Sequence, residues 1–126
     1  ITIELKSQMR SNGGNDYIQF VDNLLNLNFI NQKFQNPKYE LLIFDSLKDM
    51  YEELKIKEEE FGLCRLVAGF SWPWISDSRG NSPEEMDIVI EDMKFQWNKT
   101  PEDWVNSPNA FKEVGSIHTT KCYDLN

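Results

Sequence analysis

The chain has 126 residues, a formal net charge of −8 and 13 Lys and Arg residues that are scattered among acidic ones. This length suits one domain with a sizeable core. Because an acidic surface repels nucleic acid unless its cations cluster on one face, we expect any contact with nucleic acid to be local. No apolar run is long enough to span a membrane, and residues 1–10 lack the layout of a signal peptide. We therefore expect a cytoplasmic protein without a membrane partner.

The first predicted elements are a strand and a helix. Residues 1–5 alternate apolar and polar side chains, which is the period of a strand. Residues 11–14 interrupt this pattern with two glycines, and Asn15 is expected to cap the helix that follows. The next apolar side chains have helical spacing and predict one continuous stripe: Tyr17, Phe20, Val21, Leu24 and Leu25.

An Asn-rich connection over residues 26–38 leads to a second predicted strand. Phe29 or Phe34 is the expected apolar anchor of this connection. Residues 39–44 then form a nearly unbroken apolar run. Such a run is typical of a strand that is covered on both faces.

A second helix follows this strand. Ser46, with Asp49 three residues later, predicts a capped helix start, and Gly62 predicts its end. The apolar run over residues 63–70 predicts a third buried strand. The expected buried stripe of the helix is Leu47, Met50, Tyr51 and Leu54.

Strands and helices that alternate in this way favour a parallel sheet with helices on both faces, so we expect a three-layer α/β fold. From residue 71 the pattern changes, and residues 71–109 are interpreted as a Trp- and Pro-rich insertion. Within it, residues 87–90 are expected to form a short strand, whereas Phe95, Trp97 and Trp104 are expected in irregular structure. Residues 114–118 are the last predicted strand.

The cysteines do not indicate a disulfide framework or a metal site. Cys64 and Cys122 are far apart in the sequence, which favours reduced thiols. His118 and Cys122 have a spacing that could serve a metal on a helix, but this segment is predicted as a strand and its exit. Structural zinc usually needs four such ligands, so we expect no metal site.

Motifs for self-contained catalysis are missing. The sequence has no Gly-rich phosphate loop that ends in Lys-Ser or Lys-Thr. With one histidine, it also offers little scope for a nucleophile–histidine arrangement. Its many paired carboxylates fall on predicted helix surfaces. We therefore expect no catalytic activity from this chain alone.

Three segments carry a family resemblance. Gln8-Met9-Arg10-Ser11 resembles a superfamily 1 helicase motif that reads Tyr-Arg-Ser or Phe-Arg-Cys. Residues 114–124, which read VGSIHTTKCYD, resemble a later motif with the core His-x-x-Lys/Gln-Gly-x-Glu/Asp. Residues 65–74, which read RLVAGFSWPW, are similar to a signature of helicase-like P-loop ATPases related to the Schlafen-type ATPases. Together, the three segments extend over nearly the whole chain.

This resemblance implies that residues 1–126 are a truncated second (C-terminal) RecA-like domain with a mostly parallel sheet. Such a domain closes over ATP and Mg²⁺ that are bound mainly by an N-terminal ATPase domain of the same protein. Arg10 is then the catalytic residue that reaches the γ-phosphate, where a guanidinium stabilises the charge of phosphoryl transfer.

The same resemblance implies a contact with single-stranded nucleic acid. His118, Thr119 and Thr120 are expected to line the nucleic-acid side of the later motif. Lys121 is expected to meet a phosphate of the nucleotide, and Asp124 is expected to touch its sugar or its metal-bound water. This sequence departs from the family pattern at one position of the motif, where Cys122 stands in place of glycine.

Structural alternatives stand beside these functional interpretations. Arg10 could be a surface arginine after a strand, and His118 a strand-end histidine that binds backbone. The chain as a whole could be a non-enzymatic protein-interaction module or a degenerate domain that has lost its nucleotide contacts. The tryptophans could form a stacking platform for unpaired bases. We favour core packing for them: Trp72, Trp74, Trp97 and Trp104.

Overall fold

The computed structural model describes residues 11–28, 34–76, 84–100, 102–121 and 123. The chain divides into two compact units, Ile1–Ile43 and Phe44–Asn126, and each is considered by itself. The predicted strand over residues 1–5 lies outside the described residues. Within the described residues, no helix is long and apolar enough to cross a membrane.

In the first unit, the predicted helix is confirmed as α1, Gly14–Leu25. Its N-cap is Gly13 rather than Asn15. The Gly13 and Gly14 amides donate to the side chain and the carbonyl of Ser11, and the Tyr17 amide donates to the Gly13 carbonyl. A side chain at Gly13 would collide with Tyr17, so this helix start depends on a residue without a Cβ.

Aromatic side chains hold α1 against the chain that follows it. The Phe34 ring lies 6.1 Å from that of Tyr17 and 5.4 Å from that of Phe20. The Tyr39 ring completes the cluster, 4.9 Å from that of Tyr17. Phe34 is therefore an apolar anchor of the connection, as the sequence predicted, whereas Phe29 lies outside the described residues.

The predicted strand over residues 39–44 is wrong. Among the described residues, the ladder contact in this region is one bridge between Asn36 and Tyr39, across the turn that contains Pro37. Ile43 is 83% exposed, so the run is not covered on both faces. A short apolar run becomes a buried strand only when other strands flank it, and no described strand does so here.

In the second unit, the predicted second helix is confirmed as α2, Leu47–Phe61. The Ser46 side chain accepts a hydrogen bond from the Asp49 amide at 3.4 Å, which caps the first turn. Gly62 follows the last turn with a φ of 71°, a conformation that favours glycine. Leu47 and Tyr51 turn the apolar face of α2 toward the core.

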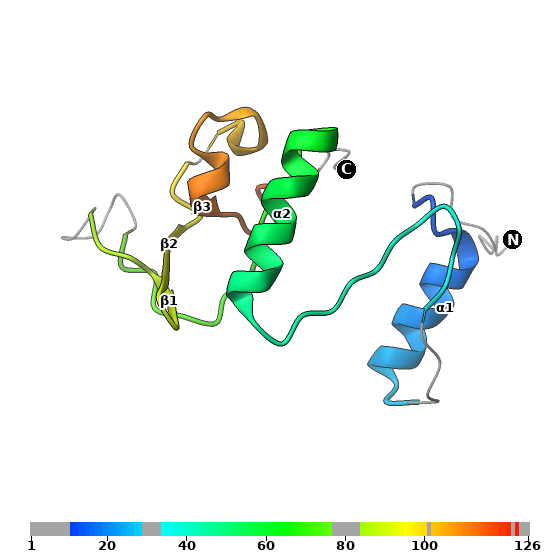
Figure 1. The fold of residues 1–126 in the computed structure, drawn as a ribbon. Helices are drawn as coiled ribbons and strands as arrows, with labels where there is room; N and C mark the ends of the chain where they lie inside the picture. The colour runs from blue at the N-terminus through cyan, green and yellow to red at the C-terminus, as the bar shows by residue number, and fades with distance from the viewer. Residues whose placement is uncertain (1–10, 29–33, 77–83, 101, 122, 124–126) are drawn as a thin grey trace, which may run out of the picture. The chain divides into compact units, whose positions relative to one another are not determined.

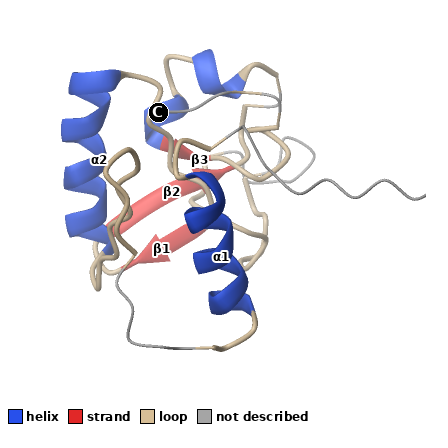
Figure 2. Ribbon diagram, turned by 90° about the vertical axis from the view of Figure 1, so that its right-hand side faces the viewer, coloured by secondary structure: helices blue, strands red, loops and turns tan. Residues whose placement is uncertain are grey.

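A small mixed sheet lies beside α2 (Figures 1 and 2). Strand β1, Ile88–Ile90, pairs antiparallel with β2, Met93–Trp97, through a two-residue turn. Strand β3, Glu113–Val114, pairs parallel with β2. Beyond β3, Val67 forms one parallel bridge with Gly115.

The expected three-layer, mostly parallel, RecA-like sheet is therefore wrong. The described chain contains two α-helices and a sheet of three short strands, of which one pair is antiparallel. The predicted strand over residues 63–70 contributes only its Val67 bridge. The predicted strand over residues 114–118 is reduced to β3 and Gly115 before the chain turns at residue 117.

The stretch that was interpreted as an insertion, residues 71–109, supplies two of the three strands. The predicted short strand at residues 87–90 is confirmed as β1. Phe95 and Trp97, which were expected in irregular structure, lie in β2. Strand pairing overrode the loop signals here because the Phe95 ring fills the core opposite Tyr51, at a ring distance of 5.3 Å.

Two groups of buried side chains hold the second unit together. The first comprises Ile88, Phe95 and Val114, one from each strand. The second comprises Trp104, Val105 and Ala110 around two short 3₁₀ helices, η1 (Trp104–Asn106) and η2 (Ala110–Lys112). The Tyr51 hydroxyl donates to the Phe111 carbonyl at 2.8 Å and so ties α2 to η2.

Candidate functional site

Two of the segments that carry the family resemblance are hydrogen-bonded neighbours. The Ala68 amide donates to the Gly115 carbonyl at 3.0 Å, and the Gly115 amide donates to the Leu66 carbonyl at 2.9 Å. Strands β2 and β3 also run parallel to each other. In parallel neighbours the carboxyl ends lie at the same edge of a sheet. The residues that follow Ala68, Trp97 and Gly115 therefore leave the sheet on one side.

Arg65, which opens the first of these segments, is occupied by the fold. Its side chain is 8% exposed and forms a salt bridge with Glu58 of α2 at 3.0 Å. The guanidinium also donates to the Val105 carbonyl at 2.9 and 2.6 Å. Because Arg65 joins α2 to η1, its role is structural.

Asp87 organises a second internal network. One carboxylate oxygen accepts the amides of Ile75 and Ser76 at 2.7 and 2.8 Å. The other accepts the Ser76 hydroxyl at 2.5 Å and the Trp97 amide at 2.7 Å. Burial raises the pKa of Asp87, but the hydrogen bonds outweigh burial and leave this pKa below its usual range. Asp87 thus anchors residues 75 and 76 to β2.

The tryptophans pack as core residues rather than as an open platform. Trp104 is 1% exposed, and Trp72 and Trp97 lie against the buried side chains of the sheet. The Trp97 indole donates to the Ala68 carbonyl at 3.0 Å, and the Trp74 ring meets the Trp97 ring edge-on at 5.4 Å. The interpretation that favoured core packing is confirmed for these side chains.

Residues 116–121 form a braced turn at the carboxyl edge of the sheet. The buried Ser116 amide donates to the Thr119 hydroxyl at 2.8 Å, and that hydroxyl donates to the Ser116 carbonyl at 2.9 Å. The Ser116 hydroxyl accepts the His118 amide at 3.2 Å and donates to the Asn98 side chain at 3.1 Å. The Thr120 hydroxyl donates to the Ser116 and Ile117 carbonyls. These hydroxyls hold the backbone of the turn in place.

A cavity of about 320 Å³ lies between this turn and the start of η1. Its polar lining includes an imidazole, an ammonium and a carboxylate, those of His118, Lys121 and Asp103. The side chains of His118 and Lys121 are exposed. Hydrogen bonds from the Tyr123 hydroxyl at 2.6 Å and the Asn106 side-chain amide at 2.8 Å lower the pKa of Asp103.

Four residues of the predicted site lie in the described part of the chain, and they lie close together. His118, Thr119 and Lys121 line one cavity, and Thr120 lies in the same turn. Arg10, Cys122 and Asp124 lie outside the described residues. The functional roles expected for all of these residues stay predictions.

Two further residues of this cavity, Asn98 and Asp103, were missed by the sequence analysis. Both have a positive φ, of 52° and 47°. Asn and Asp tolerate this conformation best after glycine, so the signal was present in the residue types, although no motif contained them.

This cavity does not fit a nucleoside triphosphate with its Mg²⁺. The residues that line it supply one ammonium group, that of Lys121. The Asp103 carboxylate lies in the same cavity and would repel a polyphosphate. Within the described part of the chain, no group of three His, Cys, Asp or Glu side chains could hold a metal ion.

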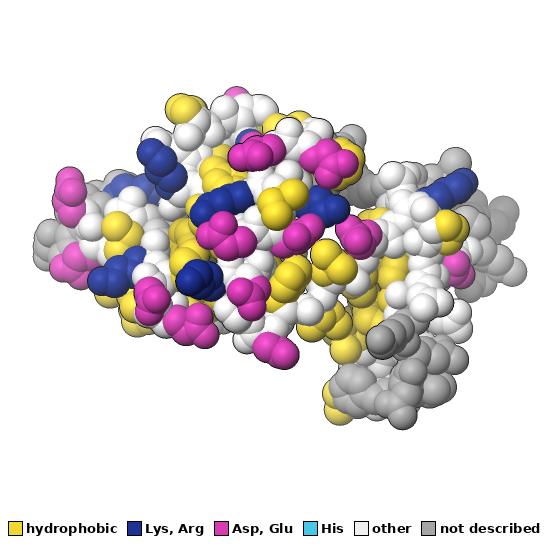
Figure 3. Space-filling view, viewed as in Figure 1, with side chains coloured by type: hydrophobic (Ala, Val, Ile, Leu, Met, Phe, Trp, Pro, Cys, Tyr) yellow, Lys and Arg dark blue, Asp and Glu magenta, His cyan; other side chains and the backbone are white. Residues whose placement is uncertain are grey.

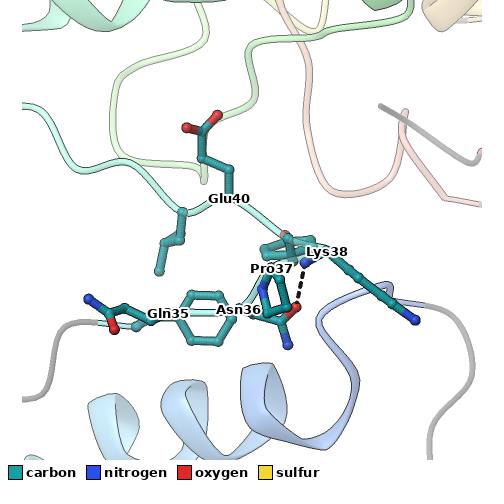
Figure 4. Close-up of a pocket in the computed structure, with 8 residues that line it drawn as sticks. Gln35, Asn36, Pro37, Lys38 and Glu40 are labelled. Carbon is teal, nitrogen blue, oxygen red and sulfur yellow. Dashed lines mark hydrogen bonds between the residues drawn. The ribbon is translucent and has the colours of Figure 1, made fainter.

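The hollow in the first unit lacks convergent polar groups. It measures about 900 Å³ and is lined by consecutive residues, 34 to 41. Figure 4 shows the Lys38 and Glu40 side chains pointing away from each other, while the Lys38 amide donates to the Asn36 side chain at 2.9 Å. This hollow therefore lacks the convergent polar groups that are typical of a binding site.

Charges of both signs are interspersed over α2 in the face that Figure 3 shows. Lys55 pairs with Glu52 at 2.8 Å, and Lys57 pairs with Glu53 at 3.8 Å. Such a surface does not attract a polyanion, which leaves the exposed turn as the better candidate for a local contact.

Comparisons with known proteins agree with the family resemblance. The family model described as "Schlafen group 3, DNA/RNA helicase domain" matches residues 1–126. The "Uncharacterized protein YPL245W" of Saccharomyces cerevisiae is 29% identical over 95 residues, which cover 70% of this chain and 19% of the yeast protein. This chain thus spans about a fifth of the length of that curated relative. No solved structure matches this chain. The chain belongs to the Schlafen group 3 family of DNA/RNA helicase domains.

Proposed function

We propose that this chain contacts single-stranded nucleic acid as part of a nucleotide-driven, helicase-like ATPase, and that it hydrolyses no ATP by itself. The observation that supports this proposal is the braced turn over residues 116–121, which presents His118 and Lys121 to solvent. The family to which the chain belongs is named for a DNA/RNA helicase domain.

The turn has the properties that a local phosphate contact needs. Its backbone is fixed by the hydroxyls of Ser116 and Thr119, so little conformational freedom is lost on binding. The Lys121 ammonium supplies a charge for a phosphate oxygen, and the His118 ring supplies a donor or an acceptor. Because the chain carries a net charge of −8, this contact positions a strand rather than supplying the whole affinity.

A nucleic-acid titration tests this proposal directly. We expect the His118→Ala/Lys121→Ala variant of the full-length protein to bind single-stranded DNA about tenfold more weakly. We also expect the slope of log affinity against log salt to fall by about 0.7 for each lost phosphate contact. The matched control is Lys55→Ala, which removes a lysine that is paired on α2. An unchanged affinity and an unchanged salt slope in the double variant would refute the proposal.

For ATP hydrolysis we propose a role for Arg10, on the strength of the motif that contains it. ATP and Mg²⁺ would be bound mainly by another domain of the same protein, and Arg10 would stabilise charge on the γ-phosphate. We expect Arg10→Ala in the full-length protein to abolish turnover while ATP binding persists. Arg10→Lys should restore turnover only in part, because lysine keeps the charge and loses the paired hydrogen bonds. Normal turnover of Arg10→Ala would remove this assignment.

A further inference from the structure

We propose that Phe70 is a stacking surface for an unpaired base of the bound strand. This inference rests on the proposed function and names the form of nucleic acid that the site recognises. The observation behind this inference is the exposure of the Phe70 side chain. Phe70 belongs to a run that was expected to be buried, yet its side chain is 72% exposed.

The exposed ring is held from below. The Phe70 and Trp97 rings lie 5.4 Å apart at an angle of 57°. Trp97 is itself fixed, because its indole donates to the Ala68 carbonyl at 3.0 Å and the Trp74 ring meets it edge-on. A ring that is supported on one side and open on the other loses little side-chain entropy when a flat ligand covers it. This is the arrangement on which bases stack.

The register of the sheet places Phe70 at the same edge as the braced turn. Ala68 and Gly115 are hydrogen-bonded in parallel strands, so Phe70 and His118 follow them out of the same side. Phe70 lies two residues after Ala68, and His118 lies three residues after Gly115. With one spacing between paired strands, the Cα atoms of Phe70 and His118 are therefore at most roughly 23 Å apart. A single strand of a few nucleotides spans such a distance.

Single-stranded nucleic acid fits this surface better than a duplex. The faces of paired bases are covered within a duplex, whereas unpaired bases can splay out onto an aromatic ring. Isolated apolar residues on a surface are common, so exposure alone would not indicate a site. Here the Phe70 ring packs against Trp97 and leaves the sheet at the same edge as the turn that carries Lys121. The Lys121 ammonium can meet the backbone of the same nucleic-acid strand.

The test compares two probes with the full-length protein. One probe is oligo-dT, and the other is an abasic oligonucleotide of the same length, which keeps the phosphates and lacks the bases. We expect Phe70→Ala to weaken binding of oligo-dT about tenfold and to leave binding of the abasic probe unchanged. Phe70→Trp should retain affinity for oligo-dT, because tryptophan keeps a flat aromatic face.

Phe70→Leu separates stacking from packing. Leucine keeps an apolar contact with Trp97 but lacks the aromatic face, so we expect it to bind oligo-dT as weakly as the alanine variant does. The His118→Ala/Lys121→Ala variant should lose affinity for both probes, which distinguishes the phosphate contact from the base contact. The inference is overturned if Phe70→Ala binds oligo-dT normally, or if it loses the same factor for both probes. The proposed function survives either result.

Discussion

The second unit contains two groups of polar side chains that differ in whether they bond within the protein or face solvent. The first group, around Arg65 and Asp87, directs its hydrogen bonds inward, to carbonyls, amides and Glu58. The second group is the turn over residues 116–121, where backbone and hydroxyls are bonded to each other and the His118 and Lys121 side chains face solvent. Polar groups that are satisfied inside a protein stabilise it, whereas exposed ones on a rigid frame are available to a ligand. Mutations should therefore act on stability in the first group and on binding in the second.

Asp87→Asn should have the largest effect on stability. Asparagine keeps one acceptor oxygen, but its amide group would face the Trp97 amide, which is also a donor. We expect a loss of about 2–4 kcal/mol in the free energy of unfolding. Urea unfolding followed by tryptophan fluorescence measures this loss, and it reports on the second unit, which contains all four tryptophans. Asp92→Asn, in the exposed turn between β1 and β2, is the control that should change little.

The pH dependence of the free energy of unfolding gives a second test of the role of Asp87. Its folded pKa is lowered relative to an unfolded value of about 3.9. The unfolded state therefore binds more protons between the two pKa values, and stability falls as the pH drops through that window. We expect Asp87→Asn to lose less stability than the unmodified protein between pH 6 and acid pH. Equal losses in the two proteins would contradict the role of this carboxylate.

Gly115→Ala should have the next largest effect. A Cβ at this position would lie under 3.0 Å from ring carbons of the buried Trp104 side chain. We expect a loss of about 1–3 kcal/mol, because the ring or the strand has to shift. Gly69→Ala is the matched control, since no atom lies within 4 Å of its added Cβ. Thermal unfolding of the two variants should separate clearly, and a stable Gly115→Ala variant would show that this contact tolerates expansion.

The His118→Ala/Lys121→Ala variant should have the smallest effect on stability. Both side chains are exposed, and the hydrogen bonds that brace the turn use other groups. We expect the free energy of unfolding to change by less than about 0.5 kcal/mol. A change in urea midpoint as large as that of Gly115→Ala would mean that these residues also belong to the fold, and the contrast between the two groups would fail.

The helices could be predicted because their signals are local. The spacing of apolar residues in α1, and the Ser46 and Gly62 caps of α2, depend on residues within a few positions of each other. Strands depend on distant partners, and the predictions of strands from the sequence were partly wrong. Residues 39–44 read as a buried strand and lie partly exposed, whereas Phe95 and Trp97 read as loop and lie in β2.

Part of the candidate site could also be predicted from local sequence signals. The motif around His118 and Lys121 could be quoted from the sequence, and these two residues do line one cavity. Asn98 and Asp103 could not be placed there, because they come from the end of β2 and the start of η1. Their positions depend on the pairing of β2 with β3, which joins segments that are far apart in the chain.

The sequence alone determined the family, the two helices and the core character of the tryptophans. Each of these follows from residue types at short range or from the order of the motifs. Only the tertiary structure decided the mixed sheet, the inward use of Arg65 and Asp87, and the exposure of Phe70. The physical reason is that burial and hydrogen bonding are properties of pairs of distant segments, and a single segment does not contain its partner.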